Sequence, residues 1–140
     1  MSDNIIYQDN LDGITDQNLN GFFVGWPNPP SPQTHLQLLQ DSYAIALALH
    51  ADSNTVVGFA NAISDGVLTA YIPLLEVLPD WQDRGIGSEL VRRLTDELDE
   101  LYMVDLCCDE ELTPFYDRLG FSPTRGMILR NYEHQSGRSE

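Results

Sequence analysis

The segment Gln82-Asp83-Arg84-Gly85-Ile86-Gly87 has the composition of a phosphate-binding loop. It follows the apolar run 68–77 and precedes a helical pattern from Ser88 to Leu101. Glycines let a backbone approach a ligand closely, and the unpaired N–H groups of a first helical turn point toward an anion. The sequence therefore predicts that a phosphate-bearing cofactor binds at this loop between a strand and a helix.

The two cysteines, Cys107 and Cys108, are adjacent in a predicted buried strand from Met103 to Cys108. Neighbouring strand side chains point to opposite faces, so we expect no disulfide between them. Buried cysteines usually act as apolar filler, so we expect no acyl-enzyme thiol. No histidine or cysteine spacing in the sequence is typical of a metal site, and we expect no metal.

The apolar and turn segments alternate in a way that predicts an α/β layer arrangement on a mixed sheet. Residues 43–49 and 55–63 form a predicted hairpin, and the strand 68–77 contains Pro73, which removes a ladder donor. The other predicted elements are a strand at 5–7, a short helix within 12–25, a helix after Ser31 with Pro32 at its first position, helices at 88–101 and 110–119, and strands at 103–108 and 127–131.

The chain has 140 residues, which is the usual size of one domain. We expect a single domain over residues 1–132 and a polar, disordered tail over residues 133–140. No apolar stretch is long enough to span a bilayer, and the N-terminus lacks the pattern of a signal peptide. These features predict no membrane association and a cytoplasmic location.

The net charge is −15, and all seven basic residues are arginines. Nucleic acid is therefore not an expected partner, because backbone phosphates need a basic face. A cationic substrate would be drawn toward such a protein. The simpler interpretation, which we favour, is that the acidity keeps the protein soluble in a salty or otherwise unusual cytoplasm.

Two signatures together resemble those of the GNAT (Gcn5-related) N-acetyltransferases. The family's diphosphate loop, Arg/Gln-x-x-Gly-x-Gly/Ala, is matched by Gln82-x-x-Gly85-x-Gly87 after Val77-x-Pro79, and its second signature by Phe115-Tyr116-x-x-Leu119-Gly120-Phe121. One predicted helix and one predicted strand separate them, as in the family. The run from Asp109 to Tyr116 also resembles a branch that includes plant plastid serotonin-type acetyltransferases and bacterial relatives. The resemblance implies an α/β (α+β) fold with a mixed, mostly antiparallel sheet, splayed between its fourth and fifth strands and flanked by helices.

The resemblance also implies acetyl-CoA as the acyl donor. Backbone N–H groups of the loop would wrap the diphosphate, Arg84 could reach a phosphate, and the side chain of Asp83 would point to solvent. The strand 68–77 would pair with the pantetheine arm, and the N–H of Leu75 would polarise the thioester carbonyl. The predicted cofactor-binding residues are Leu75, Glu76, Val77, Gln82, Asp83, Arg84, Gly85, Ile86, Gly87, Ser88, Asp109 and Tyr116.

Tyr116 matches the family's general acid. Its residue type and helical spacing alone would favour a core tyrosine, and the signature reverses that interpretation. Glu76 is the candidate general base, although a solvent-facing or ion-paired strand carboxylate fits it equally well. Asp65, Asp109 and His50 are weaker candidates. Asp109 could instead cap the helix that carries Tyr116, and a water chain could also serve as the base.

The aromatic residues Phe22, Phe23, Trp26 and Tyr71 could line an acceptor pocket, although each one singly is better read as a core residue. The expected reaction is direct acetyl transfer to a primary amine, either a small amine, including an arylalkyl amine, or a protein amine. The alternatives are an acyl-CoA-binding sensor without turnover and an unrelated nucleotide-binding fold. A homodimer is compatible with the family.

Overall fold

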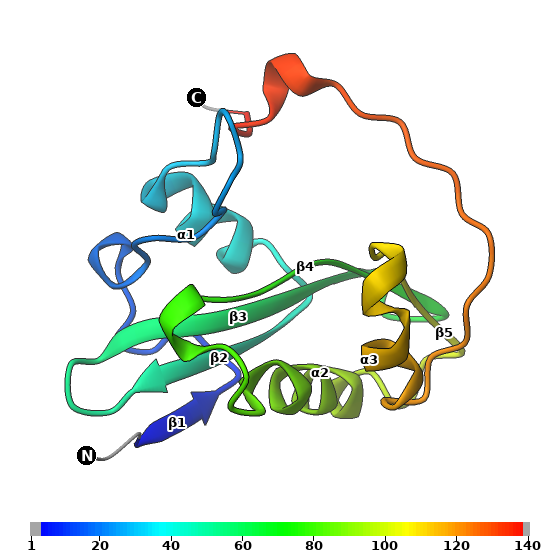
Figure 1. The fold of residues 1–140 in the computed structure, drawn as a ribbon, viewed down its shortest axis with the longest axis horizontal. Helices are drawn as coiled ribbons and strands as arrows, with labels where there is room; N and C mark the ends of the chain where they lie inside the picture. Colours follow the sequence, from blue (N-terminus) through cyan, green and yellow to red (C-terminus); the bar gives the residue numbers. More distant parts are fainter. Residues whose placement is uncertain (1–3, 139–140) are drawn as a thin grey trace.

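The computed structural model describes residues 4–138. Its centre is one five-stranded sheet in the order β1-β2-β3-β4-β5, drawn from blue to yellow in Figure 1. The first three pairings are antiparallel, and β4 pairs with β5 in parallel. The predicted mixed, mostly antiparallel sheet is therefore confirmed. The strands are β1 (Ile5–Gln8), β2 (Ala44–His50), β3 (Thr55–Ser64), β4 (Thr69–Val77) and β5 (Met103–Leu106).

Two layers cover the two faces of the sheet (Figure 1). The long helix α2 (Ile86–Glu97) packs on one face, where Leu90 and Leu94 are fully buried against alanines of β2 and β3. A short helix η1 (Asp16–Asn18), the loop that follows it and α1 (Pro32–Gln40) cover the other face. The alternation of strand side chains explains why one strand feeds both cores. For example, Val57 lies in the cluster under α2, whereas Val56 and Phe59 lie in the opposite cluster. Val57 and Phe59 would share one face of a regular strand, and the register irregularity between β2 and β3 at this place separates them.

Helix α1 begins as the sequence predicts. The Ser31 hydroxyl accepts a hydrogen bond from the Thr34 N–H at 3.1 Å, and Pro32 occupies the first helical position. A serine cap satisfies one of the unpaired N–H groups, and proline has no N–H to lose there. The helix expected within residues 12–25 is reduced to the three residues of η1, capped by Thr15.

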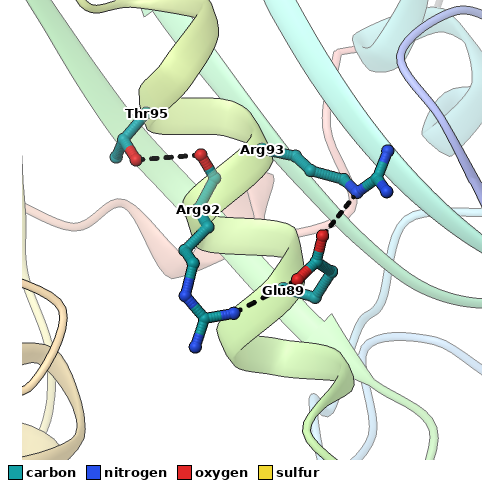
Figure 2. A network of polar contacts seen from close by, with 4 residues as sticks. All are labelled: Glu89, Arg92, Arg93 and Thr95. Atoms are coloured by element: carbon teal, nitrogen blue, oxygen red, sulfur yellow. Dashed lines mark hydrogen bonds and ion pairs between the residues drawn. The ribbon is translucent and has the colours of Figure 1, made fainter.

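The solvent face of α2 carries a small polar network (Figure 2). Glu89 accepts from Arg92 Nη1 at 3.2 Å and from Arg93 Nε at 2.8 Å, and Thr95 Oγ1 donates to the Arg92 carbonyl at 3.1 Å. Ion pairs at these spacings stabilise an exposed helix by a few tenths of a kcal/mol, roughly 0.3–0.5 each. Arg93 also lies over the Tyr7 ring at 4.6 Å and so ties α2 to β1.

Several predicted boundaries are wrong at the C-terminal side. The strand expected at 127–131 does not form, because these residues pair with no strand of the described chain. Strand β5 ends at Leu106, so Cys107 and Cys108 are exposed and free, and their predicted burial is wrong. The helix expected at 110–119 divides into η3 (Glu110–Leu112) and α3 (Thr113–Asp117).

The polar segment from Glu133 is placed as far as Arg138, and residues 139–140 lie outside the described residues. A short helix η4 (Tyr132–His134) leads into it. The side chain of Gln135 accepts a hydrogen bond from the Asn28 N–H at 2.8 Å, which holds this segment near α1 (Figure 1).

Candidate active site

Strand β4 is longer than its parallel partner, and this difference opens the sheet. The pairing with β5 runs from Thr69↔Met103 to Ile72↔Leu106 and then stops, whereas β4 continues to Val77 alongside β3. Pro73 is the first residue beyond the pairing, and it has no N–H to donate to a neighbour. The second half of β4 therefore offers an open backbone edge on the side where β5 has ended.

The register shows which backbone groups face this open edge. The Leu78 N–H donates to the Val57 carbonyl at 2.8 Å, and the same register continues to Leu75 opposite Ala60. In an antiparallel pair, hydrogen-bonded and non-hydrogen-bonded positions alternate. Leu75 and Val77 therefore direct their N–H and C=O groups away from β3. The side chain of Gln82 confirms this for Val77, because its Nε2 donates to the Val77 carbonyl at 2.9 Å.

The loop between β4 and α2 contains two left-handed backbone positions. Asp83 has φ of 65° and Gly85 has φ of 82°, and between β4 and this loop lies a short helix η2 (Pro79–Trp81). Gly85 is the N-cap of α2, and no side chain caps the helix. The N–H groups of its first turn are thus left to solvent or a ligand, and the helix dipole favours an anion there.

Arg84 is folded back onto the loop. Its Nη2 donates to the Asp80 carbonyl at 3.1 Å, and its guanidinium lies over the Trp81 ring at 4.8 Å. Arg84 therefore rigidifies the loop while its charge stays next to the start of α2. A positive side chain at this place adds to the attraction that the helix terminus exerts on an anion.

Helix α3 meets the start of α2 at the end of β4. A methyl group added at Gly87 would lie 3.5 Å from the Phe115 ring and 3.8 Å from Val77, so these elements are in van der Waals contact around that glycine. Tyr116 follows Phe115 in α3, and its ring packs edge-on against Phe115 at 4.8 Å and Phe121 at 5.9 Å. The second signature therefore lies against the loop, as its separation in the sequence predicts.

The phenol of Tyr116 remains protonated at neutral pH. Burial, reinforced by the neighbouring Cys108, raises the pKa of Tyr116 to about 12. Its hydroxyl has no hydrogen-bond partner within residues 4–138. A half-buried phenol that keeps its proton and is not engaged elsewhere can donate that proton to a reacting group.

Glu76 lies on the opposite face of the sheet from α2. Its Oε1 accepts from the Phe23 N–H at 2.8 Å, and its Oε2 accepts from the Val24 N–H at 3.2 Å. Phe23 adopts a left-handed conformation with φ of 64°, so the carboxylate fixes a tightly turned loop. Neither the solvent-facing nor the ion-paired reading of Glu76 holds, because both oxygens bind backbone N–H groups. The loop that holds Glu76 has no signal in the sequence beyond its glycines Gly21 and Gly25.

The weaker base candidates have structural roles in their own turns. Asp65 Oδ1 accepts from the N–H groups of Val67, Leu68 and Thr69, and these bonds hold the pKa of Asp65 below its usual value. His50 contacts Ser53 Oγ at 3.0 Å and packs against Trp81. Asp109 precedes η3 without a side-chain capping bond, so the cap predicted for it is wrong.

The aromatic residues divide into two groups. Phe22 and Phe23 are buried with Phe59 around His35, whereas Trp26 and Tyr71 keep more than a third of their surface exposed. His35 is 1% exposed, and neither ring nitrogen has a hydrogen-bond partner within the described residues. Burial lowers the pKa of His35 to about 4, so it is neutral at pH 7. The sequence analysis missed His35, and its position on the apolar stripe of α1 with Leu39 is the signal that could have indicated a buried histidine.

A cavity of about 850 Å³ lies beside β5. It is lined by the end of α2, by β5, by α3 and by residues 119–126 and 128, and Tyr116 is the one predicted site residue on its wall. The open edge of β4 and the residues from Gln82 to Ser88 do not line it. We therefore take the open edge of β4 beyond Ile72, together with the start of α2, as the candidate cofactor site.

A match to a protein family agrees with this geometry. The model of the acetyltransferase (GNAT) family matches residues 11–121, and the chain belongs to that family. The match includes both signatures and ends at Phe121. The family uses acetyl-CoA as its acyl donor, which agrees with a loop and an open strand edge suited to a long phosphate-bearing ligand.

Relatives of the chain come from algae, plants and bacteria. The chain is 33% identical over 101 residues to the N-acetyltransferase ycf52 of Pyropia yezoensis, itself uncharacterised, covering 70% of this chain and 58% of that protein. It is 37% identical over 89 residues to the chloroplastic GCN5-related N-acetyltransferase 3 of Arabidopsis thaliana, covering 62% of this chain and 38% of that protein. The predicted relationship to plastid members is thereby confirmed. The chain therefore spans little more than half the length of the first of these relatives and less than half the length of the second.

A solved structure is more similar over its full length. The crystal structure of a candidate acetyltransferase from Deinococcus radiodurans R1 is 49% identical, with a TM-score of 0.94, covering 97% of this chain and 94% of that one. Within residues 4–138, no helix is long and apolar enough to cross a membrane. The same residues contain no group of three or more histidine, cysteine or acidic side chains that could hold a metal ion.

Proposed function

We propose that the protein transfers an acetyl group from acetyl-CoA directly to a primary amine. The observation that carries this proposal is the open half of β4, where Leu75 and Val77 present backbone groups beside an uncapped helix terminus. The two features lie in the order that acetyl-CoA needs, with the amides of pantetheine along the strand and the diphosphate at the start of α2.

Each part of the cofactor has a matching group in this proposal. The N–H groups of Ile86, Gly87 and Ser88 bind the diphosphate, and Arg84 supplies a positive charge beside it. The Leu75 N–H points toward the open edge and donates to the acyl carbonyl oxygen. A fixed donor at that place stabilises the negative charge that develops on the oxygen during acyl transfer.

Tyr116 and Glu76 carry the proton steps. Tyr116 is the general acid, because its phenol is protonated at neutral pH and has no other partner within the described residues. Glu76 holds the loop of Phe23 and Val24 and is the candidate base, either directly or through water. Asp109 lies between the end of β5 and the helices η3 and α3, where it can border the cofactor's arm.

The acceptor class follows from charge. An overall net charge of −15 attracts a cationic amine and repels an anionic one. The loop of residues 21–26 borders Glu76, so exposed Trp26 and Val24 are the residues we expect near the acceptor. We also propose a reducing, cytoplasmic setting, in which the two exposed cysteines stay free.

Calorimetry with CoA and a thiol-release assay over a panel of primary amines test the proposal. We expect CoA to bind and at least one cationic amine to yield free CoA in step with acetylated product. Binding of CoA without turnover on any amine would support the acyl-CoA sensor instead. If calorimetry of folded protein gave no binding heat with millimolar CoA, both the acetyltransferase and the acyl-CoA sensor would be excluded. Binding of ATP or NAD in place of CoA would indicate a different nucleotide site.

A further inference from the structure

Cys107 and Cys108 lie directly after the end of β5, outside any helix or strand. Strand β5 ends at Leu106, and η3 begins at Glu110. Both cysteines are exposed and free, and they are the only two cysteines of the chain. In a strand, neighbouring side chains would point to opposite faces. Because the strand has already ended, that alternation does not hold the two thiols apart.

Both cysteines line the cavity of about 850 Å³ beside β5. The wall of the cavity also carries Tyr116 from α3 and residues 119–126, which follow α3. A methyl group added at Gly126 would lie 3.8 Å from Cys107 Sγ, so the segment after α3 passes close to this thiol. The two cysteines therefore border one space, and because both are exposed, a small reagent can reach them from solvent.

Each of the two cysteines adjoins a tyrosine. The Tyr71 hydroxyl is hydrogen-bonded to the thiol of Cys107, and this bond raises the pKa of Tyr71. Burial and then the neighbouring Cys108 raise the pKa of Tyr116. Tyr71 belongs to the part of β4 that pairs with β5, whereas Tyr116 belongs to α3. A chemical change at the cysteine pair therefore reaches one tyrosine on the sheet and one on the helix.

A disulfide between adjacent cysteines has less than the usual span. Consecutive Cα atoms lie about 3.8 Å apart across a trans peptide, whereas most disulfides join Cα atoms about 4.4–6.8 Å apart. Such a bond is strained, and strained or exposed disulfides are readily reduced by thiols. In reducing surroundings the disulfides that do form are usually transient. The position of these cysteines therefore suits a reversible modification better than a permanent crosslink.

We propose that Cys107 and Cys108 form a dithiol site that a peroxide oxidises and a small thiol restores. The sulfur of one thiol attacks an oxygen of hydrogen peroxide, the O–O bond breaks, and a sulfenic acid and water form. The second thiol attacks the sulfenic sulfur, the S–S bond forms, the S–O bond breaks, and a second water leaves. Together the thiols give up two protons and two electrons, which reduce the peroxide to water. Two molecules of a small thiol reverse the oxidation by exchange and become a disulfide themselves.

Oxidation changes the surroundings of both tyrosines. It removes the thiol to which the Tyr71 hydroxyl is bonded and the ionisable neighbour of Tyr116. It also draws two residues on the cavity wall together. Oxidised protein then turns over more slowly, a consequence that rests on the proposed function, in which Tyr116 is the general acid. The oxidation itself does not depend on acetyl transfer.

Intact mass measurement and thiol titration of the full chain test the oxidation. Dilute protein is treated with hydrogen peroxide and then with dithiothreitol. We expect both titratable thiols to disappear and the mass to fall by about 2 Da, because two hydrogens are removed, and dithiothreitol should restore both thiols. Cys107→Ser and Cys108→Ser lack the second thiol, so the remaining thiol should stop at a sulfenic acid that dimedone traps. The chain has no further cysteine, so each variant is the matched control for the other.

Three results would overturn the proposal. The first is survival of both thiols at a peroxide concentration that gives sulfenic acid in the single variants. The second is a disulfide that forms only between two chains, seen on a non-reducing gel. The third is direct passage to sulfinic acid, which dithiothreitol does not reverse.

Nuclear magnetic resonance of ring-labelled tyrosines tests the link to Tyr71 and Tyr116. We expect both signals, assigned with the two Tyr→Phe variants, to shift on oxidation, while the signal of exposed Tyr43 stays in place. Unshifted Tyr71 and Tyr116 signals would refute the link.

Turnover is measured separately, as the initial rate of acetylated product, because released CoA is itself a thiol. We expect it to fall by about tenfold on oxidation, a part of the roughly 10²–10⁴-fold that a general acid contributes. Equal turnover in both forms, with shifted tyrosine signals, would count against Tyr116 as the general acid and would leave the oxidation result standing.

Discussion

At the scale of single residues, environment decides the chemistry of the candidate site more than residue type does. Tyr116 and Glu76 sit on opposite sides of the sheet's open half, one packed in aromatic rings and the other bound by two backbone N–H groups. His35 shows the same dependence in the core, where burial among aromatic rings lowers its pKa and keeps it neutral at pH 7. Three predictions belong to this scale.

Replacing Tyr116 with phenylalanine removes the proton donor and little else. We expect kcat to fall by roughly 10²-fold or more, since general acids contribute about 10²–10⁴. The affinity for CoA, measured by calorimetry, should stay within about twofold, because the aromatic packing remains. The exposed Tyr43→Phe is the control and should match the wild type. Unchanged turnover in Tyr116→Phe would remove Tyr116 from the mechanism.

Replacing Glu76 separates its two roles. Glu76→Gln leaves one backbone N–H without an acceptor, which we expect to lower the free energy of unfolding by about 1–3 kcal/mol. If Glu76 is also the base, Glu76→Ala loses the acidic limb of the pH–rate profile, and added formate restores turnover. Exposed Glu133→Gln serves as the control. Retention of the acidic limb in Glu76→Ala would show that Glu76 only positions the loop.

His35 should make folding stability sensitive to acid. Its pKa is about 4 in the folded state and 6.5 in the unfolded chain. The unfolded state therefore binds a proton first, and the free energy of unfolding falls as the pH drops from about 6.5 to 4. The full effect is about 3 kcal/mol, because one unit of pKa corresponds to about 1.4 kcal/mol. Urea unfolding across this range should show a smaller fall in His35→Leu, and exposed His134→Gln should follow the wild type. Parallel profiles for wild type and His35→Leu would refute this account.

At the scale of elements, the site depends on where strands and helices stop. The end of β5 at Leu106, the proline at position 73 and the uncapped start of α2 together leave the open edge where we place the cofactor. None of these features is a side chain that reacts. They act by leaving backbone groups unpaired where a ligand can use them.

Gly85→Ala tests the start of α2. Gly85 has φ of 82°, and an added methyl group would meet no atom within 4 Å, so the expected cost is backbone strain alone, about 1–2 kcal/mol. Gly13→Ala is a matched control, because Gly13 has φ of 76° and equally open surroundings. Thermal or urea unfolding should show similar losses for both variants. Calorimetry should show weaker CoA binding only for Gly85→Ala, and equal CoA affinity in the two variants would place the diphosphate elsewhere.

At the scale of the whole molecule, charge is the dominant feature. Seven arginines face 22 acidic residues, so like charges repel one another across a small body. Self-repulsion of this kind destabilises the compact state, and salt screens it.

Added salt should therefore stabilise the protein. Between about 0.05 and 1 M NaCl the screening length shortens to about 3 Å, so the midpoint of thermal unfolding should rise by several degrees. An equal osmolality of sucrose should be compared, since it stabilises without screening charge. A midpoint that does not rise with NaCl, or rises no more than with sucrose, would show that repulsion is not limiting.

Local sequence determined many of the secondary structure elements and the motifs of the candidate site. The hairpin of β2 and β3, the Ser31 cap, the glycine loop and the second signature were all predictable, because periodicity, capping and turn chemistry act over a few residues. The order of the two signatures also made the family and the cofactor class predictable. Local chemistry was sufficient wherever a segment's neighbours in space are also its neighbours in sequence.

Only the tertiary structure decided which groups meet. Three findings depend on how distant segments are arranged in space: Glu76 binds the loop at Phe23, His35 is buried with no hydrogen-bond partner among residues 4–138, and Cys107 and Cys108 are exposed. The strand predicted at 127–131 is the clearest case. Its residues favour a strand, but a strand needs a partner strand, and residues 127–131 pair with none among the described residues.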